Sequence, residues 1–144
     1  MAHYRKFSLT MDAADPLALG EFWAAALDYV FEAPPAPYET WEETLAAWGL
    51  PEERWNDANA IVDPDEVGPR IYIQKVPEGK SAKNRVHLDV RVSASVDAKD
   101  RAALQAKAAE LVALGATQVE VFDDPQQGYW IVMTDPEGNE FCVV

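Results

Sequence analysis

The pattern of apolar and polar positions occurs twice along the chain. An alternating segment over 7–12 precedes an apolar helical pattern over 16–27, and a second alternating segment over 85–91 precedes a helical pattern over 98–114. Each half then ends in strand patterns around an Asp-Pro turn. Because a half of about 70 residues covers its own sheet poorly, two copies that pair around a shared cleft are expected. The sequence therefore predicts an α+β fold of two βαβββ modules that form a cup-shaped cleft.

The first module is expected to occupy residues 4–76. In its first strand the odd positions are apolar and the even positions are polar, so Phe7 is expected on the helix face and Ser8 on the opposite face. Its helix is expected to begin at Pro16, with Asp15 as the N-cap. Alternation and short apolar runs between turn residues predict strands over 7–12, 28–32, 58–62 and 71–76.

A helical insertion over 34–57 has no counterpart in the second half. Thr40 begins a capping-box pattern, which predicts a short helix. Trp41, Trp48 and Trp55 follow one another at intervals of seven residues. They are interpreted either as a lid that stacks on a flat or apolar ligand, with Trp41 and Trp55 as ligand contacts, or as a cluster that anchors the insertion.

A polar segment over 77–84 is expected to link the modules. The second module then covers 85–144, and the whole chain, 1–144, is interpreted as one domain. In the first strand of this module the apolar side chains are expected to face the helix, at Val86, Leu88, Val90 and Val92.

Composition limits the partners of the protein. The 144 residues include 12 basic and 25 acidic side chains, which gives a formal charge of -13. Such a surface repels phosphate backbones and anionic lipid, so nucleic acid and membrane surfaces are not expected as partners. No secretory signal is visible, and the single cysteine, Cys142, fits a reducing compartment. A cytoplasmic protein is expected.

Four segments in a fixed order carry a family resemblance. They are Asp15-Pro16 to Leu27, Val76-Pro77-Glu78 to His87-Leu88-Asp89, Leu114-Gly115-Ala116 and Asp135-Pro136-Glu137-Gly138-Asn139-Glu140-Phe141-Cys142. Together they resemble the vicinal oxygen chelate superfamily, which includes glyoxalase I, extradiol dioxygenases and the fosfomycin and bleomycin resistance proteins, and within it the glyoxalase-like domain branch. The resemblance implies that each module curves its sheet into half a cup around a ligand site. It also implies a homodimer, with the cup formed within one chain or across two.

The resemblance further implies that a divalent metal is held by the first and last strands of each module. His87 is a usual ligand type in a usual position, whereas Ser8 stands in place of a histidine or glutamine and Cys142 in place of a glutamate. Tyr72 and Gln74 occupy the comparable positions in the last strand of the first module. Because this ligand set departs from the family pattern, we expect the purified protein to carry little transition metal.

Several polar residues are candidates for the ligand site. His87 is interpreted as a metal ligand or general base, or as a structural histidine bonded to Asp89 or Arg91. Asp12, Asp89 and Arg91 are candidates for orienting a polar ligand, because a guanidinium grips a carboxylate with two parallel hydrogen bonds. The alternative is ion pairing that serves only structure.

Two residues of the last strand complete the candidate set. Cys142 is interpreted as a soft metal ligand beside His87 and Gln74, as a nucleophile, or as small apolar packing. Glu140 lies two residues earlier on the same face, where its carboxylate would act as a general base or lie in water at the mouth of the cup.

Two functions follow from these residues. The incomplete ligand set favours a protein that binds a small polar or aromatic metabolite in the cleft without a complete metal site. The alternative is a metal-dependent lyase, isomerase or hydrolase of the vicinal oxygen chelate type, in which the metal polarises a carbonyl or enolate oxygen. The fold alone does not decide whether the protein is an enzyme.

Overall fold

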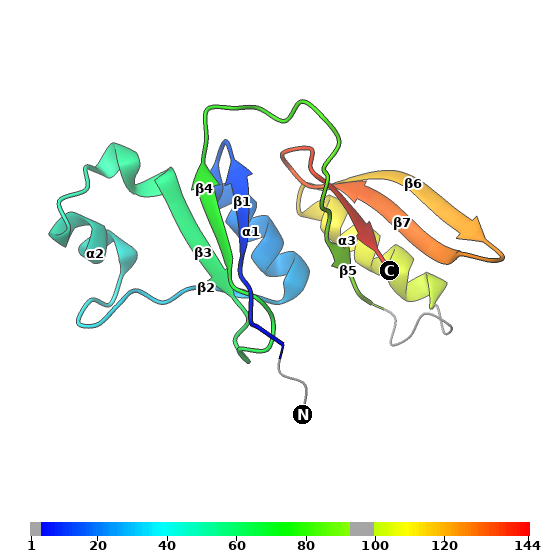
Figure 1. Ribbon diagram of the computed structural model, residues 1–144, viewed down its shortest axis with the longest axis horizontal. Helices are drawn as coiled ribbons and strands as arrows, with labels where there is room; N and C mark the ends of the chain where they lie inside the picture. Colours follow the sequence, from blue (N-terminus) through cyan, green and yellow to red (C-terminus); the bar gives the residue numbers. More distant parts are fainter. Residues whose placement is uncertain (1–3, 93–99) are drawn as a thin grey trace. The chain divides into compact units, whose positions relative to one another are not determined.

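The computed structural model describes residues 4–92 and 100–144 (Figure 1). Residue contacts group the chain into two compact units, Met1–Gly79 and Lys80–Val144. The division falls inside the polar segment 77–84. None of the helices in the described ranges is long and apolar enough to cross a membrane.

The first unit contains one four-stranded sheet and the helix that packs on it. The strands lie in the order β1-β4-β3-β2, with β1 parallel to β4 and the other neighbours antiparallel. The elements are β1 (Leu9–Ala13), α1 (Pro16–Leu27), β2 (Val30–Phe31), β3 (Ala58–Val62) and β4 (Ile71–Lys75).

Helix α1 begins and ends where the pattern predicts. The Asp15 carboxylate accepts a hydrogen bond from the Ala18 N–H at 3.2 Å, and Pro16 takes the first helical position, where its missing N–H costs nothing. The helix ends at Asp28, which adopts the left-handed conformation with φ 56°. Leu19 and Trp23 are almost fully buried, so the apolar face of the helix fixes it on the sheet.

The insertion forms helix α2 (Trp41–Ala47) and the 3₁₀ helix η1 (Glu52–Asp57). Thr40 caps α2, because its hydroxyl accepts from the Glu43 N–H at 3.1 Å. The Glu43 carboxylate accepts from the Glu39 N–H rather than from that of Thr40. The capping box is therefore present with its return bond displaced by one residue.

The second unit has the same topology as the first. Its strands lie in the order β5-β8-β7-β6, and β5 is parallel to β8. This arrangement confirms the α+β fold with two four-stranded sheets, each built from a βαβββ sequence of elements. The elements are β5 (Asp89–Val90), α3 (Arg101–Ala113), β6 (Thr117–Asp124), β7 (Gly128–Thr134) and β8 (Glu140–Val143).

The strand register repeats between the units as well. Thr10 of β1 lies opposite Tyr72 of β4, and Asp89 of β5 lies opposite Cys142 of β8. The sequence offset between Thr10 and Asp89 is also the offset between Ser8 and His87.

The first strand of each unit is shorter than predicted. Strand β1 begins at Leu9, and Phe7 is 63% exposed instead of lying against the helix. Strand β5 contains two residues, and Val86 is 77% exposed. The alternation in the sequence extends beyond the parallel ladder, which bonds only part of each segment. The beginning of the predicted helix over 98–114 lies outside the described residues up to position 99, and α3 begins at Arg101.

The second sheet has one buried face and one half-exposed face. Ile131 and Met133 of β7 and Phe141 of β8 are buried and lie on the side that α3 covers. The alternate side chains, among them Trp130 and Cys142, are half-buried and point to the opposite side. We call this second side the open face of the second sheet.

Candidate functional site

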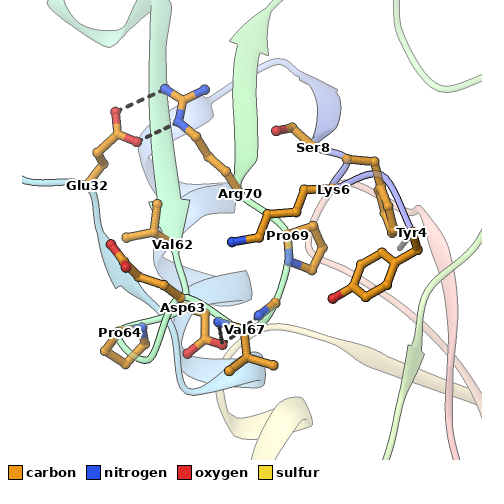
Figure 2. Close-up of a pocket in the computed structure, with 13 residues that line it drawn as sticks. Tyr4, Lys6, Ser8, Glu32, Val62, Asp63, Pro64, Val67, Pro69 and Arg70 are labelled. Atoms are coloured by element: carbon orange, nitrogen blue, oxygen red, sulfur yellow. Dashed lines mark hydrogen bonds and ion pairs between the residues drawn. The ribbon is translucent and has the colours of Figure 1, made fainter. Parts of the chain in front are cut away.

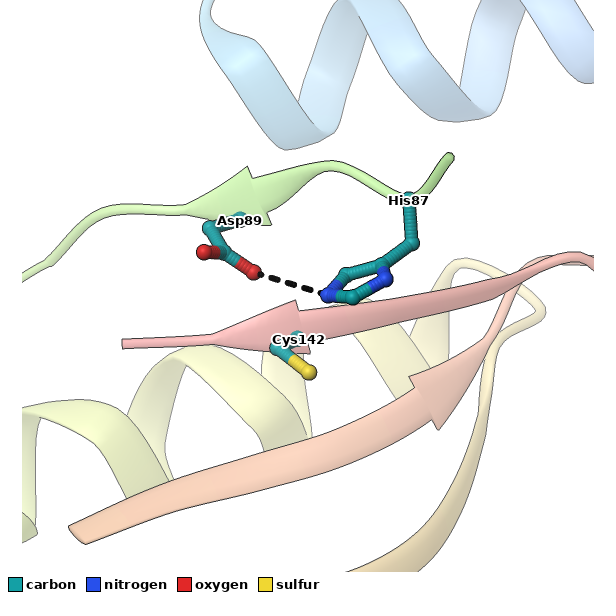
Figure 3. Close-up of side chains that lie close together, drawn as sticks. All are labelled: His87, Asp89 and Cys142. Carbon is teal, nitrogen blue, oxygen red and sulfur yellow. Dashed lines mark ion pairs between the residues drawn. The ribbon is translucent and has the colours of Figure 1, made fainter. Parts of the chain in front are cut away.

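Three chemically reactive side chains converge on the open face (Figure 3). The Nε2 atom of His87 lies 3.5 Å from Oδ1 of Asp89, and one ligand atom from each of His87, Asp89 and Cys142 lies within 4.8 Å of the others. A cavity of about 250 Å³ opens beside them, lined by His87, Asp89, Gln127, Tyr129, Trp130, Cys142 and Val144.

The backbone explains why this trio forms. His87 and Asp89 are two residues apart on an extended segment, and such side chains point to the same side. Asp89 is also the direct register partner of Cys142 across the β5–β8 ladder. The ladder holds this register through the Cys142 N–H, which donates to the Leu88 carbonyl at 3.0 Å. The sheet thus places an imidazole, a carboxylate and a thiol together.

The Cys142 thiol is kept neutral by its surroundings. Burial is the main cause that raises its pKa, and the negative charge of Asp89 raises it further, while Lys83 acts weakly in the opposite direction. Because the thiolate is the nucleophilic form, this environment does not support the nucleophile interpretation.

The donor atoms of the trio suit a metal ion that is intermediate between hard and soft, such as Zn²⁺. Zinc binds imidazole nitrogen, thiolate sulfur and carboxylate oxygen at about 2.0–2.3 Å. The ligand atoms of the trio all lie within 4.8 Å of one another, so one cation could contact all three after they move closer together. Sequence reasoning missed Asp89 as the carboxylate donor. The signal was available, since the His-x-Asp spacing on a strand places both side chains on one face.

A flat aromatic surface adjoins the trio. Trp130 of β7 stacks on Phe122 of β6, with ring centroids 4.9 Å apart and an interplanar angle of 8°. The two residues are register partners across the antiparallel ladder. A polar cluster beside stacked rings fits a small molecule that has a polar group and a flat or apolar part.

Glu140 forms hydrogen bonds with the segment that precedes β5. Its carboxylate accepts from the Asn84 N–H at 2.9 Å and from Lys80 Nζ at 3.1 Å. Backbone N–H donation, led by that of Asn84, lowers the pKa of Glu140 to about 2. A carboxylate with this pKa is a weak base, and its oxygens are already engaged by Asn84 and Lys80, so these contacts favour an anchoring role for Glu140 over the predicted general base.

Three other predicted positions lie on the corresponding face of the first sheet. Gln74 Nε2 donates to Asp12 Oδ1 at 2.9 Å, as their opposed register permits. The guanidinium of Arg70 lies 5.6 Å from the centroid of the Tyr72 ring. These contacts hold Asp12, Tyr72 and Gln74 in place within the first unit.

The remaining predicted residues lie in other surroundings. Ser8 lines a separate cavity in the first unit (Figure 2). Within the described part of the second unit, Asp89 pairs with His87 and no ion pair forms between Asp89 and Arg91. The structure therefore brings His87, Asp89 and Cys142 together and leaves Arg91 outside that cluster.

The tryptophans of the insertion have contacts within the first unit. The Trp41 indole N–H donates to the Glu32 carbonyl at 2.7 Å, and that of Trp55 to the Leu50 carbonyl at 2.9 Å. Trp41 also meets Trp48 edge to face, with centroids 6.3 Å apart. These contacts favour the anchoring interpretation, and the lid interpretation stays a prediction.

Comparison with known families and structures gives consistent results. A family model described as glyoxalase-like domain matches residues 8–144. No curated protein matches the chain.

Solved structures of similar fold come from several bacteria. A glyoxalase/bleomycin resistance protein/dioxygenase family enzyme from Burkholderia phytofirmans PsJN is 16% identical, with 94% of each chain covered and a TM-score of 0.63. The bleomycin-binding protein from Streptomyces verticillus, complexed with copper(II)-bleomycin, is 15% identical, with 100% of this chain and 98% of that chain covered and a TM-score of 0.54.

A third similar structure is a mutant fosfomycin resistance protein from Listeria monocytogenes, complexed with Mn(II) and 1S,2S-dihydroxypropylphosphonic acid. It is 11% identical, with 99% of this chain and 90% of that chain covered and a TM-score of 0.63. At these low sequence identities, the similarity to the three structures shows a shared fold and nothing more specific.

Proposed function

Because this chain belongs to the glyoxalase-like domain family, we propose that it binds a small polar or aromatic molecule on the open face of the second sheet. The observation that carries the proposal is the convergence of His87, Asp89 and Cys142 on one cavity beside the indole of Trp130. Members of this superfamily include binding proteins and metal-dependent enzymes, so the site decides the function.

The chemistry of the open face indicates the kind of ligand. An imidazole offers both a donor and an acceptor when neutral, and the Asp89 carboxylate offers acceptors. A ligand with a polar group can hydrogen-bond to these two side chains while a flat ring packs against Trp130. Stacking on an aromatic ring contributes about 0.5–1.5 kcal/mol beyond burial.

A thermal-shift screen of small polar aromatic compounds tests this function. Compounds that bind should raise the melting temperature of the wild-type protein, and the rise should shrink in His87→Ala and Trp130→Ala. Glu110→Gln, a surface change on α3, is the matched control and should keep the full rise. Equal shifts in all four proteins would reject the open face as the binding site.

The second candidate function is metal-dependent chemistry at the same trio. It is favoured by one observation, the three unlike donor atoms within 4.8 Å of one another. A cation held by His87, Asp89 and Cys142 would act as a Lewis acid on a substrate oxygen.

Metal analysis separates the two candidates. If the protein is a metal-free binder, protein purified without chelator or affinity tag should carry well under one equivalent of transition metal, and chelator should leave its melting temperature unchanged. Close to one equivalent of metal, lost in both His87→Ala and Cys142→Ser, would reject the metal-free binder and favour the second candidate.

The assembly is part of the same proposal. On the basis of family membership we expect a homodimer in the cytoplasm. Light scattering coupled to size exclusion should then give twice the 16.0 kDa mass of one chain. A mass of 16.0 kDa at micromolar concentration would contradict the dimer.

A further inference from the structure

The first unit has a cavity of its own, of about 640 Å³, at one end of its sheet (Figure 2). Its walls come from the segment 4–8 that leads into β1, from Glu32 after β2, and from the connection 62–70 between β3 and β4. The volume falls within the range of about 300–1,000 Å³ that is typical of small-molecule pockets.

The wall formed by the β3–β4 connection is held in shape by specific bonds. The Asp63 carboxylate accepts from three backbone N–H groups of its own loop at distances from 2.7 to 3.0 Å. The Tyr29 hydroxyl donates to the Pro69 carbonyl at 3.0 Å. A Cβ atom on Gly68 would lie 2.1 Å from the Tyr29 hydroxyl oxygen, so this close approach requires glycine. The wall is therefore preformed.

Of the two cationic residues that line the cavity, Lys6 and Arg70, Lys6 is the one without an ion-pair partner among the described residues. Arg70 and Glu32 form a two-point ion pair, with Nε–Oε2 at 2.5 Å and Nη2–Oε1 at 3.0 Å, and so neutralise each other. Asp63 is engaged by its loop, and Glu66 is exposed. Lys6 makes no hydrogen bond or ion pair with any described residue, and its side chain extends into the cavity between Arg70 and Pro69 (Figure 2).

The rim of the cavity carries exposed apolar groups. Val67 is 79% exposed, Phe7 is 63% exposed and Tyr4 is 78% exposed. All three line the same cavity, together with Val62. Apolar side chains gathered around a polar centre are typical of a site that a ligand covers.

We propose that this cavity binds a small monocarboxylate with an aromatic or branched apolar body. The carboxylate pairs with the Lys6 ammonium, which extends into the cavity. The apolar body packs against Val62 and Val67. This second site belongs to the first unit alone and is independent of the trio on the open face.

The charges around the cavity disfavour a dianion more than a monoanion. Lys6 and Arg70 face three carboxylates, those of Glu32, Asp63 and Glu66, so a second negative charge on the ligand would add repulsion without gaining a further cation. The net charge of -13 gives no long-range attraction for any anion. Affinity must therefore depend on the local ammonium and on apolar contact.

Phenylacetate is a suitable probe because phenylacetamide has the same shape without the charge. In ¹H–¹⁵N NMR titrations of the full chain, phenylacetate should bind with a Kd on the order of 1 mM, the value expected for about ten non-hydrogen atoms. The shifts should centre on the amide of Ser8 and on those of 62–68 other than Pro64, which has no N–H. Phenylacetamide should bind at least about fivefold more weakly, and inorganic phosphate should not saturate these amides.

Variants of Lys6 assign the ammonium. Lys6→Met should weaken phenylacetate binding by at least about fivefold, and Lys6→Arg should retain most of it. Lys75→Met is the matched control, because Lys75 is an exposed lysine of β4 that does not line the cavity. The NMR spectrum of each variant reports its fold. Equal binding of phenylacetamide, unchanged affinity in Lys6→Met, saturation by phosphate, or shifts that centre elsewhere would each overturn the proposal.

Discussion

At the scale of the residue, the open face of the second sheet controls the ionisation of Cys142. Burial and the neighbouring Asp89 carboxylate both raise the pKa of the thiol. The neutral form is thus favoured near neutral pH. A bound cation would reverse this balance, because positive charge beside a thiol stabilises the thiolate.

The raised pKa of the Cys142 thiol predicts how fast this residue is alkylated. In chelator-treated protein, iodoacetamide should react slowly at neutral pH and faster as pH rises, because only the thiolate attacks. Asp89→Asn removes one cause of the raised pKa, so the rate at a given pH should increase a few-fold. Glu120→Gln, which removes an exposed carboxylate on β6, is the control and should leave the rate unchanged. A slower rate in Asp89→Asn would contradict the assigned electrostatics.

Glu140 gives a prediction about pH and stability. Its pKa of about 2 in the folded protein lies below its ordinary value of 4.5. The ionised group therefore stabilises the fold above pH 4.5, and that contribution is lost as pH falls toward 2.

Melting curves across this pH range test the prediction. Glu140→Gln should melt several degrees below wild type at neutral pH, and the difference should shrink as the pH approaches 2. The control variant Glu120→Gln should have the same melting temperature as wild type at every pH. A difference that is constant with pH would mean that the charge of Glu140 does not stabilise the fold.

At the scale of the element, the insertion is fixed to the end of β2 by one indole. Trp41 is half-buried and donates to Glu32, whereas Trp48 in the same helix region is 62% exposed. The two tryptophans thus form a natural comparison between an anchoring and a surface position.

Alanine substitutions distinguish the anchoring interpretation of the tryptophans from the lid interpretation. Trp41→Ala should lower the free energy of unfolding by about 2 kcal/mol, and Trp48→Ala should change it by no more than about 0.5 kcal/mol. Urea unfolding measures both values. Neither variant should change the affinity for a compound that binds the open face. Weaker binding in Trp41→Ala or Trp55→Ala at unchanged stability would restore the lid interpretation.

The elements also show how far the sequence determined the fold. Helix α1, strand β3 and the paired βαβββ order follow from periodicity, caps and turns, which are local signals. The short length of β5 does not, because β5 pairs with β8 only at Asp89 and Val90, and the extent of pairing between segments distant in sequence is not a local signal. Val86 therefore continues the apolar alternation of the sequence and still lies exposed.

At the scale of the whole molecule, the candidate sites were harder to predict than the fold. His87 and Cys142 could be predicted from their strand positions and from the family resemblance. The His-x-Asp spacing predicts that Asp89 shares a face with His87, but the contact of Asp89 with Cys142 depends on the β5–β8 register. The position of Lys6 depends on how the β3–β4 connection folds. These two relations join segments that are distant in sequence, so the periodicity of the sequence does not predict them.

The most direct test of the central claim is an NMR-mapped screen of small polar aromatic compounds on the ¹⁵N-labelled protein. If the open face is the binding site, at least one compound should shift the amides of Asp89, Trp130 and Cys142 together, and the shifts should vanish in His87→Ala or Trp130→Ala. Binding compounds that leave these three amides unchanged, or that shift them equally in wild type and both variants, would contradict the account.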